Sequence, residues 1–224
     1  MAFAKVQSAN GSGSSIALTG VGAGHLIVML ASWSGGSGSI TISDGTSSLT
    51  MGSVYRTASG GQFSGQVGWL LSANSGNKTY TITGESATDI IIWEFSYSNS
   101  CFHDFETGTN GHSTSVSSGT QSSSGLDELY VACAGTYNTE TWSSLQIGGN
   151  AATGSQAGKT YDESWYYAYS GAFSGAATAT IGSDYWLCVL ESFIEEVPWN
   201  PGTSGFPYIQ NKDPIFPVSE IIPY

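Results

Sequence analysis

Basic residues, prolines, cysteines and long apolar runs are all scarce in this sequence, and each shortage argues against a class of protein. The 224 residues include five Lys and Arg against 17 Asp and Glu, which gives a net charge of −12. Nucleic acids and anionic bilayers are bound through basic surfaces, so this balance argues against both as partners. Charged residues make up only 10% of the chain, but 12% are aromatic, which is unlike a disordered polar chain.

The longest apolar run, Leu26–Ala31, is far too short to span a bilayer. The first residues lack a charged segment followed by an apolar core, so we expect no signal peptide. The three cysteines, Cys101, Cys133 and Cys188, are an odd number without CxxC spacing. We therefore expect buried thiols in a protein that folds in a reducing cytoplasm.

Proline is absent from the first 197 residues, as expected of paired strands, because proline cannot donate a ladder hydrogen bond. Short apolar runs recur along this region and are separated by turns rich in Gly, Ser, Asn and Asp. Thr79–Thr83 alternates polar and apolar residues, which is typical of a half-buried strand. No stretch has a sustained helical period, so the sequence predicts an all-β protein.

The two halves of this region repeat similar runs in the same order. His25–Trp33, for example, parallels Glu128–Thr136. We predict that residues 1–197 form a single large antiparallel β-sandwich, jelly-roll-like, with pseudo-repeats over about 1–98 and 112–197. Two tandem Ig-like sandwiches are the alternative, since each half is long enough for one.

The last part of the chain, residues 198–224, differs in composition. It holds all six prolines and many large apolar residues, so it is neither a helix nor a solvated linker. We predict an extended arm that binds a neighbouring subunit. Its expected anchors are Trp199, Phe206, Tyr208, Ile209, Phe216, Ile221, Ile222 and Tyr224.

Metal-binding patterns are weak. His103, Asp104, Glu106 and His112 could supply ligands, but their spacing fits no familiar zinc pattern and no cysteine pair accompanies them. We expect these to be loop residues that hold no metal, and we expect no cofactor.

Catalytic patterns are also weak. No GxSxG nucleophile elbow occurs. Glu94 and Glu191 stand on equivalent strands of the two halves, where structural repetition explains them as well as catalysis does. They keep a polysaccharide hydrolase open as a weaker alternative. We expect no enzyme and assign no catalytic residue.

Aromatic residues on one predicted strand suggest a different function. Trp165, Tyr167 and Tyr169 share a face, and exposed aromatic rings on a β-sandwich can stack on sugars. The competing interpretation is that they fill the core. A carbohydrate-binding adhesin module is therefore the alternative function, with a glycan as its partner.

The order of the strand motifs resembles a family of jelly-roll-like β-sandwich proteins of tailed bacteriophages, which are structural proteins of the virion or tail. The resemblance covers residues 3–196 and excludes the proline-rich arm. The motifs that carry it are Gly24–Leu30, Ile42–Gly45, Trp93–Ser96, Asp127–Ala132 and Asp184–Phe193. These are strand patterns, so the resemblance implies a fold and a virion setting but no active site.

These observations predict a non-enzymatic structural protein of a tailed-phage virion, assembled in the host cytoplasm. It would decorate or cement the capsid, or form part of a tail or fibre. Its expected partners are other virion proteins, such as the major capsid or tail protein, and copies of itself.

Overall fold

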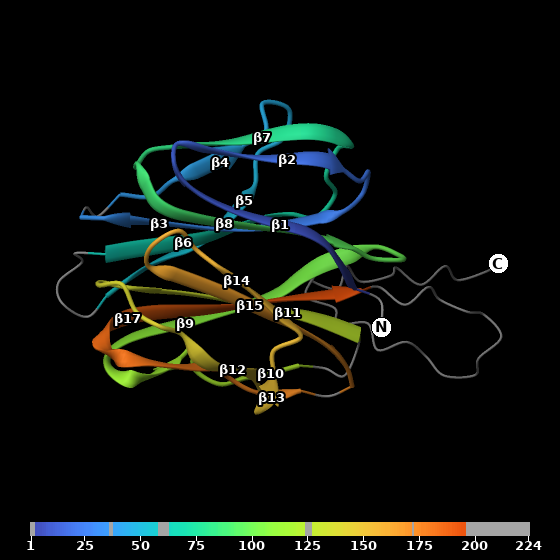
Figure 1. The fold of residues 1–224 in the computed structure, drawn as a ribbon. Coiled ribbons are helices and arrows are strands. Elements are labelled where there is room, and N and C mark those ends of the chain that lie inside the picture. The colour runs from blue at the N-terminus through green and yellow to red at the C-terminus, as the bar shows by residue number, and fades with distance from the viewer. Residues whose placement is uncertain (1–2, 36–37, 58–62, 124–126, 172, 196–224) are drawn as a thin grey trace, which may run out of the picture.

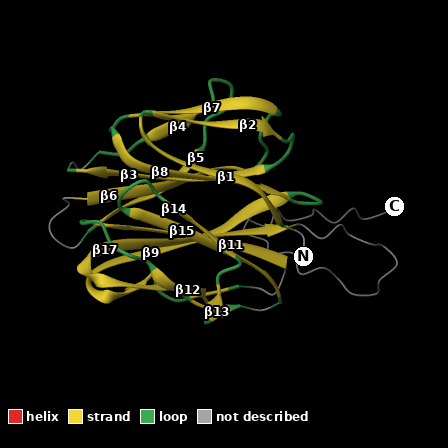
Figure 2. Ribbon diagram, in the orientation of Figure 1, coloured by secondary structure: helices red, strands yellow, loops and turns green. Residues whose placement is uncertain are grey.

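The computed structural model describes residues 3–35, 38–57, 63–123, 127–171 and 173–195. Within these ranges the protein contains strands and no helix (Figure 2). Every ladder between the strands is antiparallel. The prediction of an all-β, antiparallel sandwich is confirmed. The predicted arm, residues 198–224, lies outside the described residues.

The strands are stacked in four layers (Figure 1). We call the two middle layers the inner N and inner C sheets, and the two flanking layers the outer N sheet and the outer C layer. The outer N sheet has the order β2 (Ser15–Val21), β7 (Gly76–Thr83), β4 (Thr41–Ser43). The inner N sheet has the order β1 (Ala4–Gly13), β8 (Ala87–Ser96), β3 (Leu26–Ser34), β6 (Phe63–Leu70), β5 (Thr50–Arg56).

The C-terminal half repeats this plan. The inner C sheet has the order β9 (Cys101–Ser117), β17 (Ala177–Glu195), β11 (Asp127–Thr136), β15 (Asp162–Ser170), β14 (Gly154–Ala157). The outer C layer adds β12 (Ser143–Ile147), β13 (Asn150–Ala151), β10 (Gln121–Ser122) and β16 (Ser174–Gly175). Strand for strand, β9, β17, β11, β15 and β14 therefore occupy the places of β1, β8, β3, β6 and β5.

Two long strands belong to both C-terminal layers. The first part of β17 pairs with β12, where Ala177 faces Ile147, and its second part pairs with β11. Strand β9 follows β17 along both parts, and a register shift separates Thr180 from Asp184. A β-bulge of this kind bends a strand, so both strands pass from the outer layer into the inner sheet. The N-terminal half makes the same two corners with turns between separate strands.

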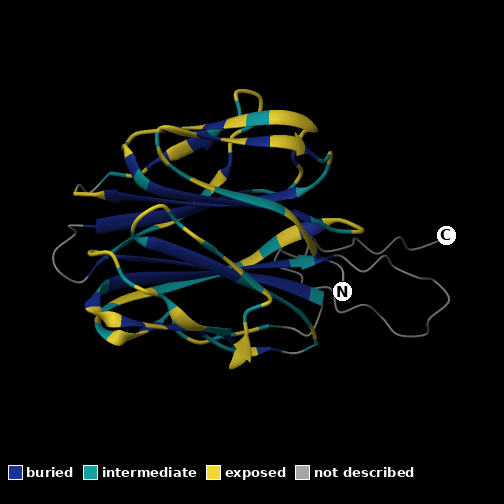
Figure 3. Cartoon of the chain, viewed as in Figure 1, coloured by how far each residue is buried: buried dark blue, intermediate teal, exposed yellow. Residues whose placement is uncertain are grey.

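Three hydrophobic cores fill the spaces between the layers. Successive side chains of a strand point to opposite faces. In β3, Ile27 and Met29 therefore enter the core beneath the outer N sheet, whereas Leu26, Val28 and Leu30 enter the core between the inner sheets. A third core lies between the inner C sheet and the outer C layer. Buried residues consequently run almost without interruption along the central inner strands β3 and β11, and exposed residues are frequent in the outer layers (Figure 3).

The register of the ladders corrects one sequence-based expectation. Phe95 faces Leu26, and Phe193 faces Leu129 in the corresponding ladder. The counterpart of Glu94 is therefore Ser192 rather than Glu191. A slip of one residue reverses the face to which a side chain points. Glu94 consequently faces the core beneath the outer N sheet, whereas Glu191 faces the core between the inner sheets. The two do not form a facing pair for hydrolysis.

Polar side chains connect the edges of the two inner sheets. On one side, Ser8 Oγ of β1 donates to Gln156 Oε1 of β14 at 2.8 Å, and Asn10 Nδ2 donates to Ala157 O at 2.8 Å. On the other side, the backbone N–H of Ser53 in β5 donates to the carboxylate of Glu106 in β9 at 3.0 Å. We call these the β1–β14 seam and the β5–β9 seam.

Candidate functional site

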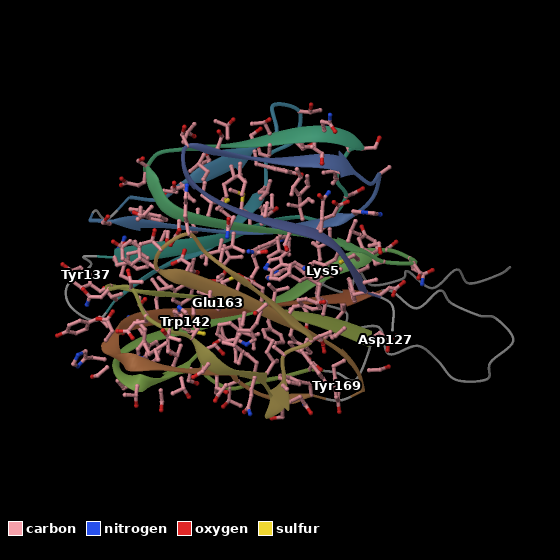
Figure 4. The ribbon with its side chains drawn as sticks, in the orientation of Figure 1. Lys5, Asp127, Tyr137, Trp142, Glu163 and Tyr169 are labelled. Atoms are coloured by element: carbon pink, nitrogen blue, oxygen red, sulfur yellow. The ribbon has the colours of Figure 1, made fainter. Side chains whose placement is uncertain are left out.

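The residues predicted to contact a partner lie partly outside the described chain. All eight arm anchors fall beyond Glu195. Among the glycan candidates, Trp165 is fully buried, and its Nε1 donates to Gln146 O at 3.0 Å. Its side chain packs in the third core, so Trp165 cannot stack on a sugar. Tyr167 and Tyr169 are half-buried with ring centroids 6.1 Å apart, and Figure 4 places Tyr169 in the lower, C-terminal half.

The four potential metal ligands do not gather into a metal site. They lie on strand β9 rather than in a loop, which is a correction to the sequence interpretation. Within the ranges described above, no group of three or more His, Cys, Asp or Glu side chains could hold a metal ion. His103 contacts Glu191, while the His112 ring lies 4.2 Å from that of Tyr185. Asp104 is exposed.

A cluster of ionisable groups lies at the β5–β9 seam. Glu106 and Glu191 face each other directly in the ladder between β9 and β17. Glu191 is fully buried, and His103 Nε2 lies 2.8 Å from its Oε2. The His103 ring stacks on Trp69, with centroids 3.9 Å apart. Tyr55 donates a hydrogen bond to Glu106.

Gly52 makes room for the two carboxylates. A Cβ at this position would stand 2.2 Å from Glu106 Oε2 and 3.3 Å from Glu191 Oε1. Glu106 Oε2 and Glu191 Oε1 thus both lie close to the backbone of Gly52, which has no side chain. Within the described residues, Glu191 Oε1 has no hydrogen-bond partner.

Burial raises the pKa of Glu191 from its ordinary value of 4.5 to about 7, and the facing Glu106 adds to the rise while His103 opposes it. The cluster can therefore hold a proton near neutral pH. A buried carboxyl with a raised pKa beside a second carboxylate is also the arrangement of an acid–base pair. However, Glu191 is fully buried, and both oxygens of Glu106 accept from Ser53 N. This arrangement suits a structural proton better than attack on a substrate.

A second polar cluster surrounds Glu94. This carboxylate is fully buried, and its Oε1 accepts hydrogen bonds from Gly22 N at 2.8 Å and from His25 Nδ1 at 2.6 Å. Its Oε2 accepts from Gln7 Nε2 at 2.5 Å. The His25 side chain remains 25% exposed, and it lines a pocket of about 480 Å³ together with Tyr97 and Cys101.

Two buried aspartates form hydrogen bonds between the N-terminal and C-terminal halves. Asp89, at the start of β8, accepts hydrogen bonds from the backbone N–H groups of Lys159, Thr160 and Tyr161. Asp162 is fully buried and accepts from Ser32 Oγ at 2.6 Å. Burial, reinforced by the charge of Asp89, holds the pKa of Asp162 well above its usual range.

All three cysteines are buried, as expected from the sequence, and have free thiols. Burial raises the pKa of the Cys101 thiol to about 12 and that of Cys133 to about 12. Nucleophilic cysteines have depressed pKa values, so these thiols are packing residues.

The His25 pocket and the β5–β9 cluster were missed by sequence reasoning. Both depend on pairs far apart in the chain: His25 with Glu94, and Tyr55 with Glu106. The one available signal was the scarcity of histidine, with only three in the chain. Two of these three, His25 and His103, contact buried glutamates.

Comparison of the chain with protein-family models, with curated proteins and with solved structures finds no match. Over the ranges that the structure describes, no helix has the length and apolar character needed to cross a bilayer.

Proposed function

We propose that this protein is a non-enzymatic structural subunit of a tailed-phage particle that works by binding copies of itself and other virion proteins. The observation that carries the proposal is the fixed position of Glu195, the last described residue before the apolar, proline-rich sequence 198–224. Glu195, the last described residue, pairs with Cys101 in the ladder to β9. Its carboxylate accepts hydrogen bonds from Ser98 N at 3.0 Å and Asn99 Nδ2 at 2.8 Å.

The fixed position of Glu195 favours an assembly function for the sequence that follows it. A segment attached to a fixed strand reaches a neighbour with less loss of conformational entropy than one attached to a loose end. Its aromatic and aliphatic side chains are the residue types that dominate binding energy at protein interfaces. The resemblance of the strand motifs to phage structural proteins supports the virion setting.

The use of the acidic groups supports a structural rather than a catalytic role. Glu94, Asp89 and Asp184 each accept a hydrogen bond from a backbone N–H outside their own strand. Their negative charges thus stabilise loop conformations, since hydrogen bonds to charged groups are stronger than neutral ones. A catalytic carboxylate would instead present a free oxygen at an accessible surface, whereas the unpartnered Oε1 of Glu191 is buried.

Sedimentation equilibrium tests the assembly role. The full chain is compared with an arm variant, Trp199→Ser with Phe206→Ser and Phe216→Ser. The matched control carries Phe102→Ser and Tyr137→Ser, which change exposed aromatic residues of the sandwich. We expect a defined oligomer for the full chain and the control, and a monomer for the arm variant. A monomeric full chain, or an arm variant with the same mass as the full chain, would contradict the proposal.

The virion setting has a separate test. Particles purified from cells that express the gene are analysed by mass spectrometry after a density gradient. Recovery of the chain at a fixed ratio to the major capsid protein is the expected result. Its complete loss from particles that are otherwise intact would count against a virion component.

A further inference from the structure

A pocket of about 480 Å³ opens at the end of the sandwich where β17 finishes. It lies between the starts of β3 and β9 and the ends of β6 and β8. Its wall includes Leu71, Tyr97 and Cys101, and its polar lining includes His25, Ser72, Asn99 and Ser100. A volume in this range is typical of small-molecule sites.

Hydrogen bonds fix three of the residues that line the pocket. His25 Nδ1 donates to the buried carboxylate of Glu94 at 2.6 Å. Asn99 Nδ2 donates to Glu195 Oε1 at 2.8 Å. The hydroxyl of Tyr97 donates to the carbonyl of Leu71. The lining is therefore held in place before a ligand enters, which reduces the entropy cost of binding.

The same bonds leave other polar atoms of the lining available. None of these three hydrogen bonds uses His25 Nε2, Asn99 Oδ1 or the hydroxyls of Ser72 and Ser100. An imidazole nitrogen, an amide oxygen and two hydroxyls can each pair with a ligand hydroxyl. The half-buried ring of Tyr97 offers an apolar surface beside them.

Among its described residues, the lining carries no lysine, arginine, aspartate or glutamate. With a net charge of −12, the whole chain also repels anions. A ligand that is uncharged, rich in hydroxyls and has one apolar face meets these conditions. We propose that this pocket binds a neutral saccharide of one or two sugar rings. The site is distinct from the Trp165–Tyr169 strand and is independent of the proposed assembly role.

A glycan array with the full chain tests the proposal. The probes are oligosaccharides that end in glucose, galactose, mannose or N-acetylglucosamine, with sialylated and sulfated glycans as charged comparisons. The pocket variant is Ser100→Tyr, which adds a large ring at an exposed residue of the lining. The matched control is Ser98→Tyr, an exposed residue of the same loop that does not line the pocket.

We expect the full chain and Ser98→Tyr to retain one group of neutral glycans, and Ser100→Tyr to lose at least about tenfold in binding. The free sugar should compete in solution. Absence of binding by the full chain, a preference for charged glycans, or equal binding by both variants would overturn the proposal. Far-UV circular dichroism confirms that both variants fold.

The arm is the competing occupant, because Glu195 lies against the loop that lines the pocket. Sedimentation of the same variants separates the two. If Ser100→Tyr dissociates the oligomer and neither the full chain nor the arm variant binds a neutral glycan, the pocket receives the arm and the saccharide proposal fails. If Ser100→Tyr lowers glycan binding and leaves the oligomer intact, the saccharide proposal is supported whatever the fate of the assembly role.

Discussion

Four buried carboxylates, those of Asp89, Glu94, Asp184 and Glu195, accept hydrogen bonds from backbone N–H groups far away in the chain, whereas Glu191 accepts none. Asp89 receives N–H groups from a loop of the other half, and Glu94 receives Gly22 N. Glu191 receives only the His103 ring, and its Oε1 has no partner in the described part of the chain. An ionised oxygen in that position is costly, so the neutral form is favoured.

Glu191 should therefore make stability depend on pH in the direction opposite to an ion-paired acid. Its folded pKa, about 7, lies above the ordinary value of 4.5, so the folded protein binds the proton more tightly. Stability should be fully present below about pH 4.5 and decline as the pH rises through 7. Glu191→Gln should flatten this decline and raise the free energy of unfolding at pH 8 by up to about 3 kcal/mol. Urea unfolding at pH 5, 6, 7 and 8 measures it.

Glu85→Gln is the matched control, since Glu85 lies in a turn of the other half. It should leave the pH profile unchanged. The remaining slope of the Glu191→Gln protein should come from Glu128, Asp162 and Glu163, whose pKa values burial also raises. A profile that is identical in wild type and Glu191→Gln would show that Glu191 is ionised in the folded protein.

At the scale of strands, sequence patterns located the apolar elements well and the polar ones poorly. The predicted strand His25–Trp33 corresponds to β3, and the alternating run Thr79–Thr83 lies within β7. The sequence gives little sign of strand β9, because most of its residues are polar or small and the strand lies at a sheet edge. The sequence suggested that Glu94 and Glu191 occupy equivalent positions, which is wrong by one residue. In a continuous apolar run, the hydrophobic pattern does not change when the alignment is shifted by one residue.

The contacts that build the candidate sites could not be predicted at this scale. They join residues such as Asp89 and Lys159, which lie on different halves of the chain. Composition and periodicity report which face of a strand is buried, but not which loop comes to rest on it. The seam between β5 and β9 depends in the same way on the packing of two complete sheets.

The loop that precedes β15 should depend on Asp89. Asn at this position keeps the shape but loses the charge, and it directs an amide N–H₂ at backbone donors. We expect Asp89→Asn to lower the free energy of unfolding by about 2–4 kcal/mol. Asp44→Asn is the comparison, because Asp44 accepts from Thr46 and Ser47 in its own turn and pairs with Lys78 at 3.2 Å, within the same half of the chain. It should cost about 1 kcal/mol, and an equal cost for both would contradict a special role for Asp89. The comparison is made by urea unfolding of both variants and the wild type at pH 7.

At the scale of the molecule, the two halves share the core between the inner sheets. Trp93 and Phe95 from one half pack there with Leu129 and Phe193 from the other. Separating the halves would expose this face of both sheets to water, at a cost of roughly 25 cal/mol for each Å² of apolar surface. The pseudo-repeated halves are therefore structural copies that remain thermodynamically dependent on each other.

Unfolding should accordingly be one transition. Tryptophan fluorescence and far-UV circular dichroism should follow the same curve in urea, with a single midpoint. Residues 1–98 expressed alone should aggregate or remain unfolded, since Trp93 and Phe95 would lose their partners. Two separate transitions, or a soluble and folded isolated half, would show that the shared core contributes little.

The path of β17 has a mechanical consequence. This strand lies between β9 and β11, and the chain leaves it at Glu195. A force that pulls on Glu195 while the rest of the sandwich is held acts along β17. The hydrogen bonds to β9 and to β11 then bear the force together rather than one after another. A pull on the C-terminal connection would therefore load the inner C sheet in shear, along its strands.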